Sequence, residues 1–122
     1  MLKVGIIGVG TVGTSVINIL RDNKNIITAR AGIEIVPVLG VVSNLHKARN
    51  VDIKLTNNID DVLNDDSIDV VVELMGGIDK PNEIVRKALL KGKAVVTANK
   101  ALLAYHRYEL QELAGDIPFE FE

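Results

Sequence analysis

The chain has 122 residues, with 14 Lys and Arg against 16 Asp and Glu, a formal net charge of −2, and no cysteine or tryptophan. This length suits a single domain, because domains cluster at roughly 100–150 residues. Without cysteine the chain holds no disulfide framework, thiolate metal site or thiol nucleophile. Near-neutral charge and 3% aromatic residues disfavour nucleic-acid binding, which needs a concentrated basic face and stacking platforms.

Apolar residues make up 48% of the chain, but their runs are far shorter than the ~20 residues that cross a bilayer. The N-terminal residues 1–4 enter an apolar run directly, without the basic region and cleavage site of a signal peptide. We therefore expect a cytoplasmic protein that binds neither membrane nor nucleic acid.

In chain order, nearly continuous apolar blocks alternate with segments of helical period. Such blocks are typical of strands buried on both faces, and their alternation with helices indicates a doubly wound parallel sheet. Segments 24–32 and 44–58 are the least regular and are predicted as surface connections. The fold class is therefore α/β, a single Rossmann-type domain over residues 1–122. Strands are expected at 2–7, 35–42, 68–74, 94–98 and 117–122, and helices at 12–23, 59–63, 84–89 and 105–114.

The first predicted strand runs directly into Gly8-Val9-Gly10-Thr11-Val12-Gly13, which opens the first helix. In this setting the G-x-G-x-x-G pattern is typical of a dinucleotide-binding turn. Gly8 allows the tight turn, Gly10 lets the backbone approach a pyrophosphate, and Gly13 permits close packing of helix and strand. The N–H groups of the helix start then face the anion. The alternative is a turn that uses glycine for geometry alone.

An acidic residue about 20 positions further on usually holds the adenosine ribose. Glu34 has that spacing, but it begins the second strand, and the ribose belongs near the other end, roughly 30 Å away at ~3.3 Å per residue. That end carries no carboxylate, and its two cations suit a 2′-phosphate. We predict NADP(H) as the preferred cofactor and NAD(H) as the second; alternatively, both cations only decorate a solvated segment. The expected cofactor contacts here are Ser43, Asn44, Lys47 and Arg49.

The segment Glu73-Leu74-Met75-Gly76-Gly77 ends a strand that should neighbour the first one. Paired glycines there let the backbone lie along the nicotinamide half of the cofactor. We therefore predict cofactor contacts from Gly76 and Gly77. Glu73 either touches ribose hydroxyls or is a strand-end carboxylate facing water, and the sequence does not favour one over the other.

Lys100 closes the segment Thr97-Ala98-Asn99-Lys100, at the end of the next predicted strand and on the cofactor side. A lysine there can hold the nicotinamide ribose or a substrate oxygen, or move a proton. It is the candidate catalytic residue and also a candidate cofactor contact. The alternative is an exposed cation in a loop.

These motifs resemble the amino-terminal, nucleotide-binding portion of homoserine dehydrogenases, over essentially the whole chain. The resemblance implies NAD(P)-dependent interconversion of homoserine and aspartate 4-semialdehyde, on the route to threonine and methionine. It also implies cofactor binding by 8–13 and 74–77, and it places Lys100 where cofactor and substrate meet. The stretches that carry it are 4–13, 71–77 and 96–104.

By the same resemblance, Glu122 is similar to the glutamate that opens the family's cation-binding loop, and it would be a partial metal site here. Family members continue into a mixed α/β domain, which supplies a second lysine, acidic residues for homoserine and the homodimer interface. We therefore expect these 122 residues to bind the nicotinamide dinucleotide without turnover.

Two other classes stay open at this point. One is the cofactor domain of another amino-acid dehydrogenase or reductase, which the Asn99-Lys100-Ala101 stretch disfavours. The other is a non-catalytic, nucleotide-sensing regulatory domain. Such sensors usually carry an acidic residue where Ser43 and Asn44 stand, and they would leave the Gly76-Gly77 motif unexplained.

Overall fold

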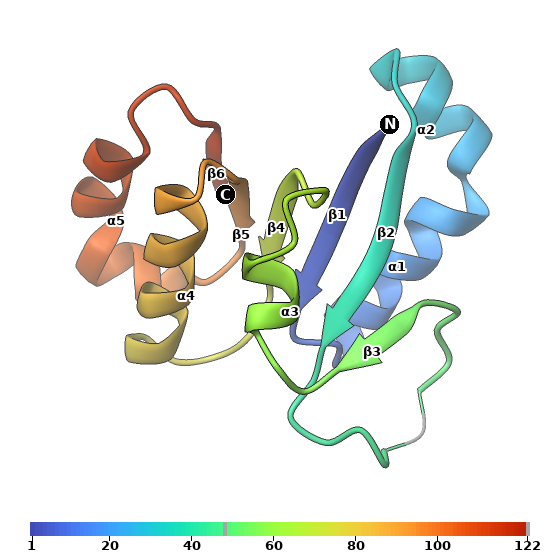
Figure 1. Cartoon of the computed structure of the whole chain (residues 1–122), viewed down its shortest axis with the longest axis horizontal. Helices are drawn as coiled ribbons and strands as arrows, with labels where there is room; N and C mark the ends of the chain where they lie inside the picture. Colours follow the sequence, from blue (N-terminus) through green and yellow to red (C-terminus); the bar gives the residue numbers. More distant parts are fainter. Residues whose placement is uncertain (48, 122) are drawn as a thin grey trace.

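A computed structural model describes residues 1–47 and 49–121 of the chain (Figure 1). Six strands form one sheet in the order β3-β2-β1-β4-β5-β6, and all neighbouring strands run parallel. The predicted doubly wound parallel sheet is therefore confirmed, with β1 in the middle between β2 and β4. The strands are β1 (Leu2–Ile7), β2 (Ile35–Val41), β3 (Lys54–Thr56), β4 (Val70–Glu73), β5 (Ala94–Thr97) and β6 (Phe119–Phe121).

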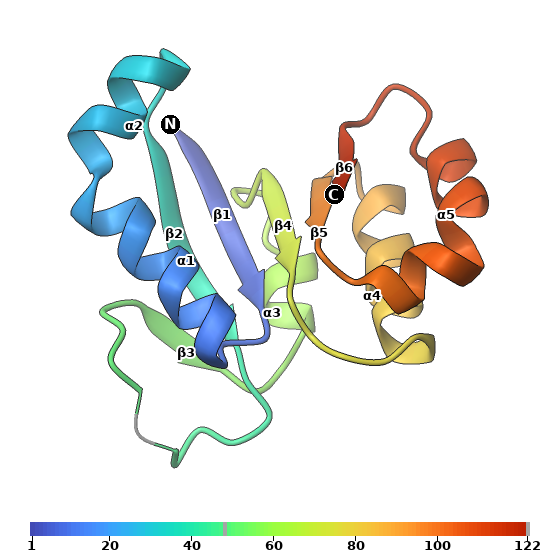
Figure 2. The same ribbon diagram turned by 180° about the vertical axis from the view of Figure 1, so that it is seen from behind.

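Helices cover the two faces of this sheet unequally. Two of them lie over one face of β1 and β2, two cover the other face, and the last packs against its predecessor (Figures 1 and 2). Figure 2 shows no helix in front of β4 and β5, and Val96 in β5 is 40% exposed there. Among the described residues, no helix has the length and apolar character of a membrane span. The helices, in chain order, are α1 (Thr11–Asp22), α2 (Lys24–Ala31), α3 (Asp60–Leu63), α4 (Asp79–Leu90) and α5 (Lys100–Ala114).

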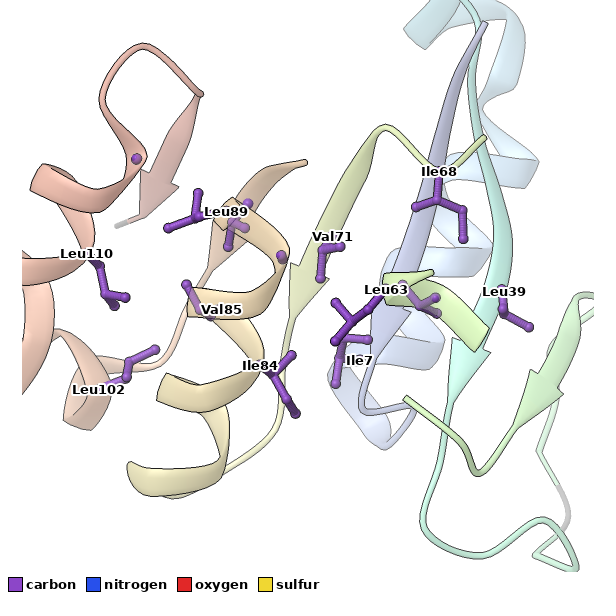
Figure 3. Close-up of a cluster of buried hydrophobic side chains, with 14 residues drawn as sticks. Ile7, Leu39, Leu63, Ile68, Val71, Ile84, Val85, Leu89, Leu102 and Leu110 are labelled. Atoms are coloured by element: carbon purple, nitrogen blue, oxygen red, sulfur yellow. The ribbon is translucent and has the colours of Figure 1, made fainter. Parts of the chain in front are cut away.

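The hydrophobic core occupies both faces of the sheet. The larger cluster fills the space between the sheet and α3, α4 and α5, with Val71 of β4 at its centre (Figure 3). In helix α4 apolar residues recur at helical spacing and form one buried stripe that faces this cluster. They are Ile84, Val85, Ala88 and Leu89. A smaller cluster lies under α1 and consists of Val4, Ile6, Val9, Ile17 and Val42.

Segments 24–32 and 44–58 contain regular elements that the sequence pattern did not predict. Helix α2 has no buried residue, so it carries no apolar stripe that could identify it. Strand β3 has three residues, of which only Thr56 is buried. Helix α5 begins at Lys100, five positions before its predicted start, because Asn99 caps it: the Asn99 side chain accepts a hydrogen bond from the amide of Leu102.

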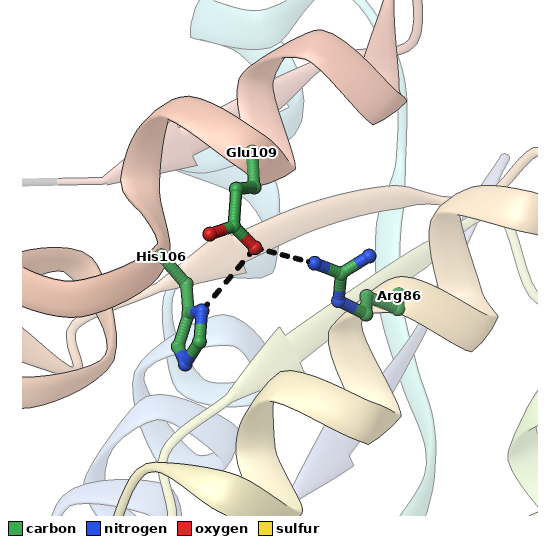
Figure 4. Close-up of polar contacts among 3 residues, drawn as sticks. All are labelled: Arg86, His106 and Glu109. Atoms are coloured by element: carbon green, nitrogen blue, oxygen red, sulfur yellow. Dashed lines mark hydrogen bonds and ion pairs between the residues drawn. The ribbon is translucent and has the colours of Figure 1, made fainter.

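Polar contacts on the surface join α4 to α5 (Figure 4). Arg86 Nη2 lies 2.6 Å from Glu109 Oε2, and His106 Nδ1 lies 3.4 Å from the same oxygen. These side chains are partly exposed, so water and salt screen their attraction and each pair contributes at most about 1 kcal/mol. The contacts orient the two helices, while the buried apolar residues supply most of the stability.

Candidate cofactor-binding site

The turn between β1 and α1 depends on two glycines for its shape. Gly8 has φ +95°, a conformation that L side chains rarely adopt, and a Cβ there would lie 3.1 Å from the Leu74 carbonyl carbon. A Cβ on Gly13 would stand 2.2 Å from the carbonyl oxygen of Gly8. Helix α1 therefore approaches the end of β1 so closely that no side chain fits between them.

Gly10 has a different environment, because a Cβ there would meet nothing within 4 Å. It is the N-cap of α1, no side chain caps the helix, and the first turn carries no acidic residue. The first N–H groups of α1 thus lack an internal anion, and the positive end of the helix dipole faces the open space beside Gly10. This cradle fits the pyrophosphate of a dinucleotide.

Two cavities lie on opposite sides of the glycine turn, at the carboxyl ends of the strands. The cavity beside β2 has a volume of about 220 Å³, and Gly8, Ser43 and Met75 contribute to its lining. The cavity beside β4 and β5 has a volume of about 350 Å³ and is lined by Val12, Leu74, Met75, Ala98, Asn99 and Lys100. In a doubly wound sheet the first suits the adenosine half of a dinucleotide and the second suits the nicotinamide half.

The second cavity brings together three motifs that the sequence analysis singled out separately: the glycine turn, the segment after β4 and Lys100. The first cavity also contains residues that the sequence analysis missed. Asn57 follows β3, which was predicted as part of a loop, and Lys80 lies in the first turn of α4, which begins earlier than its apolar stripe indicates. The missed lining residues are Ile7, Val41, Val42, Asn57, Ile59, Lys80 and Ile84.

Another cavity, of about 410 Å³, lies at the amino end of β2, away from the edge of the sheet that carries the glycine turn. Its lining includes Arg21, Ile35 and Asp52, and Ile35 is the first residue of β2. Glu34, which precedes Ile35, pairs with Lys24 at 2.9 Å. The structure thus places Glu34 at the edge opposite the glycine turn, as the analysis of the second strand predicted.

The loop after β2 is held against the glycine turn by Arg49. Its Nε donates to the carbonyl oxygen of Val9 at 3.0 Å, and its Nη1 donates to the carbonyl oxygens of Asn44 and Lys47 at 2.7 and 3.1 Å. The idea that both cations only decorate a solvated segment is therefore wrong for Arg49. The side chains of Ser43, Asn44 and Lys47 are exposed on the same loop.

Neither expectation for Glu73 is correct. Its side chain is 0% exposed, so it does not face water, and both of its oxygens are engaged inside the protein. Oε1 accepts a hydrogen bond from Thr97 Oγ1 at 2.8 Å, and Oε2 accepts one from the amide of Met75 at 2.8 Å. Burial raises the pKa of the Glu73 carboxyl above its ordinary value, and these two hydrogen bonds oppose the shift.

The loop after β4 is open and glycine-rich. Gly77 has φ +93°, and a Cβ on Gly76 or Gly77 would meet nothing within 4 Å. Asn99 reaches across from the β5–α5 turn and donates from Nδ2 to the carbonyl oxygens of Met75 and Gly77, at 3.3 and 2.8 Å. The backbone after β4 is thereby fixed beside the cavity without side chains filling it.

Lys100 is the first residue of α5 rather than the end of a strand, since β5 stops at Thr97. Its side chain is exposed and borders the second cavity. A cation in the first helical turn opposes the helix dipole and costs stability. An unfavourable charge of this kind, next to a cavity, supports a role of Lys100 in ligand binding or in catalysis. Glu122, the expected partial cation ligand, lies outside the described residues.

The strand order, the glycine turn at the central strand and the paired cavities define a Rossmann-type dinucleotide-binding domain. A family model described as "Homoserine dehydrogenase, NAD binding domain" matches residues 8–117. The chain belongs to the homoserine dehydrogenase family, as its NAD-binding domain. This membership decides against the two other classes that the sequence left open.

Curated relatives are consistent with this assignment. The homoserine dehydrogenase of Helicobacter pylori is 45% identical over 121 residues, which cover 99% of this chain and 29% of that protein. The Bacillus subtilis enzyme is 36% identical over 98% of this chain and 29% of its own length. The chain thus spans about 29% of these relatives.

Solved structures give the same result. A crystal structure of the S. aureus homoserine dehydrogenase matches with a TM-score of 0.92 and 38% identity, over 99% of this chain and 32% of that one. The Thiobacillus denitrificans homoserine dehydrogenase matches with a TM-score of 0.91 and 43% identity, over 98% of this chain and 28% of that one.

Proposed function

We propose that this chain is the cofactor-binding part of an enzyme that oxidises L-homoserine to L-aspartate 4-semialdehyde, with NAD(P)⁺ as hydride acceptor and release of one proton. The observation that carries this proposal is the second cavity, in which the glycine turn, the segment after β4 and Lys100 meet. The bound nicotinamide supplies the hydride chemistry. The residues of this chain bind and orient it.

Each part of the site has a separate task in this proposal. The N–H groups at the start of α1, next to Gly10, hold the pyrophosphate. Leu74, Met75, Gly76 and Gly77 lie along the nicotinamide half, while Lys100 binds the distal ribose or a substrate oxygen, or moves the alcohol proton. Homoserine itself binds to residues outside these 122, so the chain alone binds cofactor without turnover. The complete enzyme is a cytoplasmic homodimer.

The preferred cofactor in this proposal is NADP(H). Residues 42–47 and 49–51 of the loop after β2 include no carboxylate for a ribose 2′-hydroxyl, and Asp52, further along, pairs with Arg21 of α1 at 3.2 Å. The same loop carries the exposed Lys47 beside exposed Ser43 and Asn44. Arg49 holds this loop next to the glycine turn through Val9 and Asn44. A cation with hydroxyl and amide neighbours suits a 2′-phosphate.

The test is calorimetric titration of the chain with NADPH and with NADH. We expect NADPH to bind more tightly, and Lys47→Ala to weaken NADPH while NADH stays unchanged. Lys91→Ala, an exposed lysine after α4, is the matched control and should change neither affinity. Tighter binding of NADH would contradict the NADP(H) preference, and absence of binding to either would contradict the cofactor assignment.

A further inference from the structure

Glu73 and Thr97 are register partners at the ends of the neighbouring strands β4 and β5. Register partners in a parallel sheet project to the same face. Both side chains are buried, at 0% and 2% exposed, and Thr97 Oγ1 donates to Glu73 Oε1 at 2.8 Å. A buried side-chain hydrogen bond therefore joins the two points at which the chain leaves the sheet toward the second cavity.

Each partner extends this link into its own loop. Glu73 Oε2 accepts from the amide of Met75 at 2.8 Å, and Thr97 Oγ1 accepts from the amide of Asn99 at 3.1 Å. The Thr97 hydroxyl thus donates toward one loop and accepts from the other. The second residue of each loop, Met75 or Asn99, is thus fixed to the same buried pair.

Asn99 completes the connection. Its Nδ2 donates to the carbonyl oxygen of Gly77 at 2.8 Å, and its Oδ1 accepts from the amide of Leu102 at 3.0 Å. Because Asn99 also precedes Lys100, a shift of Asn99 would move the start of α5 and the loop after β4 together. Both segments line the second cavity.

The fold itself does not require a carboxylate here. At the same edge β1 and β2 end in the apolar residues Ile7 and Val41, which are register partners. Burial of Glu73 costs free energy, and the hydrogen bonds described for its oxygens come from a hydroxyl and an amide rather than from a cation. A costly buried group between two cavity-lining loops points to a role in shaping that cavity.

We propose that Glu73 is a positioning residue, which acts through Thr97 to hold the β5–α5 turn against the β4–α4 loop and so fixes the pocket for the nicotinamide half of the cofactor. The inference rests on the proposed function, because it takes the nicotinamide as the occupant of this pocket. Neither side chain touches the cofactor. Their contribution is the fixed distance between the Leu74–Gly77 backbone and Lys100.

The sharpest test uses Thr97, because the hydrogen bonds described for its hydroxyl lead to Glu73 and to the β5–α5 turn. Thr97→Val keeps the shape and removes the hydroxyl, whereas Thr97→Ser keeps the hydroxyl. Each variant is titrated with NADPH and with 2′-phospho-ADP-ribose, which lacks the nicotinamide ring. We expect Thr97→Val to weaken NADPH about fivefold, the equivalent of one hydrogen bond, to leave 2′-phospho-ADP-ribose unchanged, and to be rescued by Thr97→Ser.

Glu73→Gln provides the second arm and decides the outcome if Thr97→Val fails to fold. It should lower the NADPH affinity selectively too, and the double variant should lose no more than the stronger single variant, because both remove one link. Lys93→Met is the control for general destabilisation, since Lys93 is buried just before the opposite end of β5; it should leave the ratio of the two affinities unchanged.

The proposal is overturned if the single variants lower both affinities by the same factor, or neither. A wild-type chain that binds 2′-phospho-ADP-ribose and NADPH equally well would also overturn it, while leaving the dinucleotide assignment intact. A wild-type chain that binds neither probe contradicts the proposed function itself.

Discussion

The ammonium of Lys93 donates a 2.8 Å hydrogen bond to the carbonyl oxygen of Ile68, although only 4% of Lys93 is exposed. The same nitrogen donates to the carbonyl oxygen of Asp65 at 2.6 Å. Two backbone carbonyls in the turn before β4 thus accept hydrogen bonds from one lysine, and the Asp65 carbonyl also accepts one from the amide of Ile68 at 3.1 Å. This turn joins α3 to the sheet, so the contact bears on folding rather than on the cofactor site.

Lys93→Met should therefore lower the free energy of unfolding by about 1–3 kcal/mol, because the Ile68 carbonyl loses the hydrogen bond from Lys93. The Asp65 carbonyl loses one of its two described hydrogen bonds and keeps the one from the amide of Ile68. Urea denaturation of the chain measures this. Lys91→Met, two positions earlier and exposed, should stay close to wild type. Equal unfolding midpoints for the two variants would show that Lys93 contributes nothing at this position.

Gly10 and Gly13 should respond to alanine in opposite ways. Gly13→Ala places a Cβ 2.2 Å from the carbonyl oxygen of Gly8, so we expect a loss of about 1–3 kcal/mol of stability from overpacking. Gly10→Ala meets nothing within 4 Å and should leave the fold intact, but its methyl group enters the space for the pyrophosphate. Thermal melting and NADPH titration together separate the two effects; full NADPH affinity in Gly10→Ala would refute the pyrophosphate site.

Arg49→Ala should weaken NADPH and NADH alike. Its hydrogen bonds go to the carbonyls of Val9, Asn44 and Lys47, so its removal loosens the glycine turn that both cofactors need. Lys47→Ala is the matched comparison because it should affect NADPH alone. A loss confined to NADPH in Arg49→Ala would instead show that this guanidinium acts on the 2′-phosphate.

The raised pKa of Glu73 should affect how the free energy of unfolding changes with pH. Burial raises its pKa above the ordinary value of 4.5, so between 4.5 and the raised value the folded state holds more protons than the unfolded state. Its contribution to stability is therefore fully present below pH 4.5 and is lost as the pH rises through the folded-state pKa. Asp65 and Glu83 have lowered pKa values and act in the opposite sense.

Because other carboxyl groups also titrate, the informative quantity is the difference between wild type and Glu73→Gln. Urea unfolding of both proteins across this pH range should show wild type losing stability relative to Glu73→Gln as the pH rises. A constant difference would mean that the Glu73 carboxyl titrates at its ordinary pKa in the folded protein.

Lys100→Ala should separate catalysis from stability. In the longer family enzyme that contains this domain, we expect turnover to fall by about 10²-fold or more, the size of a proton-transfer contribution, with a much smaller change in cofactor affinity. In the chain alone the same change removes a cation from the first turn of α5 and should raise stability by about 0.3–1 kcal/mol. Unchanged turnover would reject the catalytic role.

Much of this architecture was predictable from local sequence. Strands β1, β2, β4 and β5 lie within nearly continuous apolar blocks, and the glycine spacing located the β1–α1 turn. Contacts between distant segments were not predictable. Glu73 bonds to Thr97, which is 24 positions away in the sequence, and Arg49 bonds to Val9, which is 40 positions away. No local sequence pattern encodes either pairing. Helix α2 was not predicted because it buries no residue, so its apolar residues show no helical period.

Gly8 and Gly13 lie so close together that glycine at these two positions does not by itself indicate a bound ligand. Both positions exclude a Cβ for reasons internal to the protein, whereas the middle glycine of the pattern, Gly10, faces open space. A related protein that no longer bound the cofactor would still need Gly8 and Gly13 in order to fold, whereas another residue could replace Gly10. Among sequences with this turn, the identity of the middle glycine position is therefore the informative marker of retained dinucleotide binding.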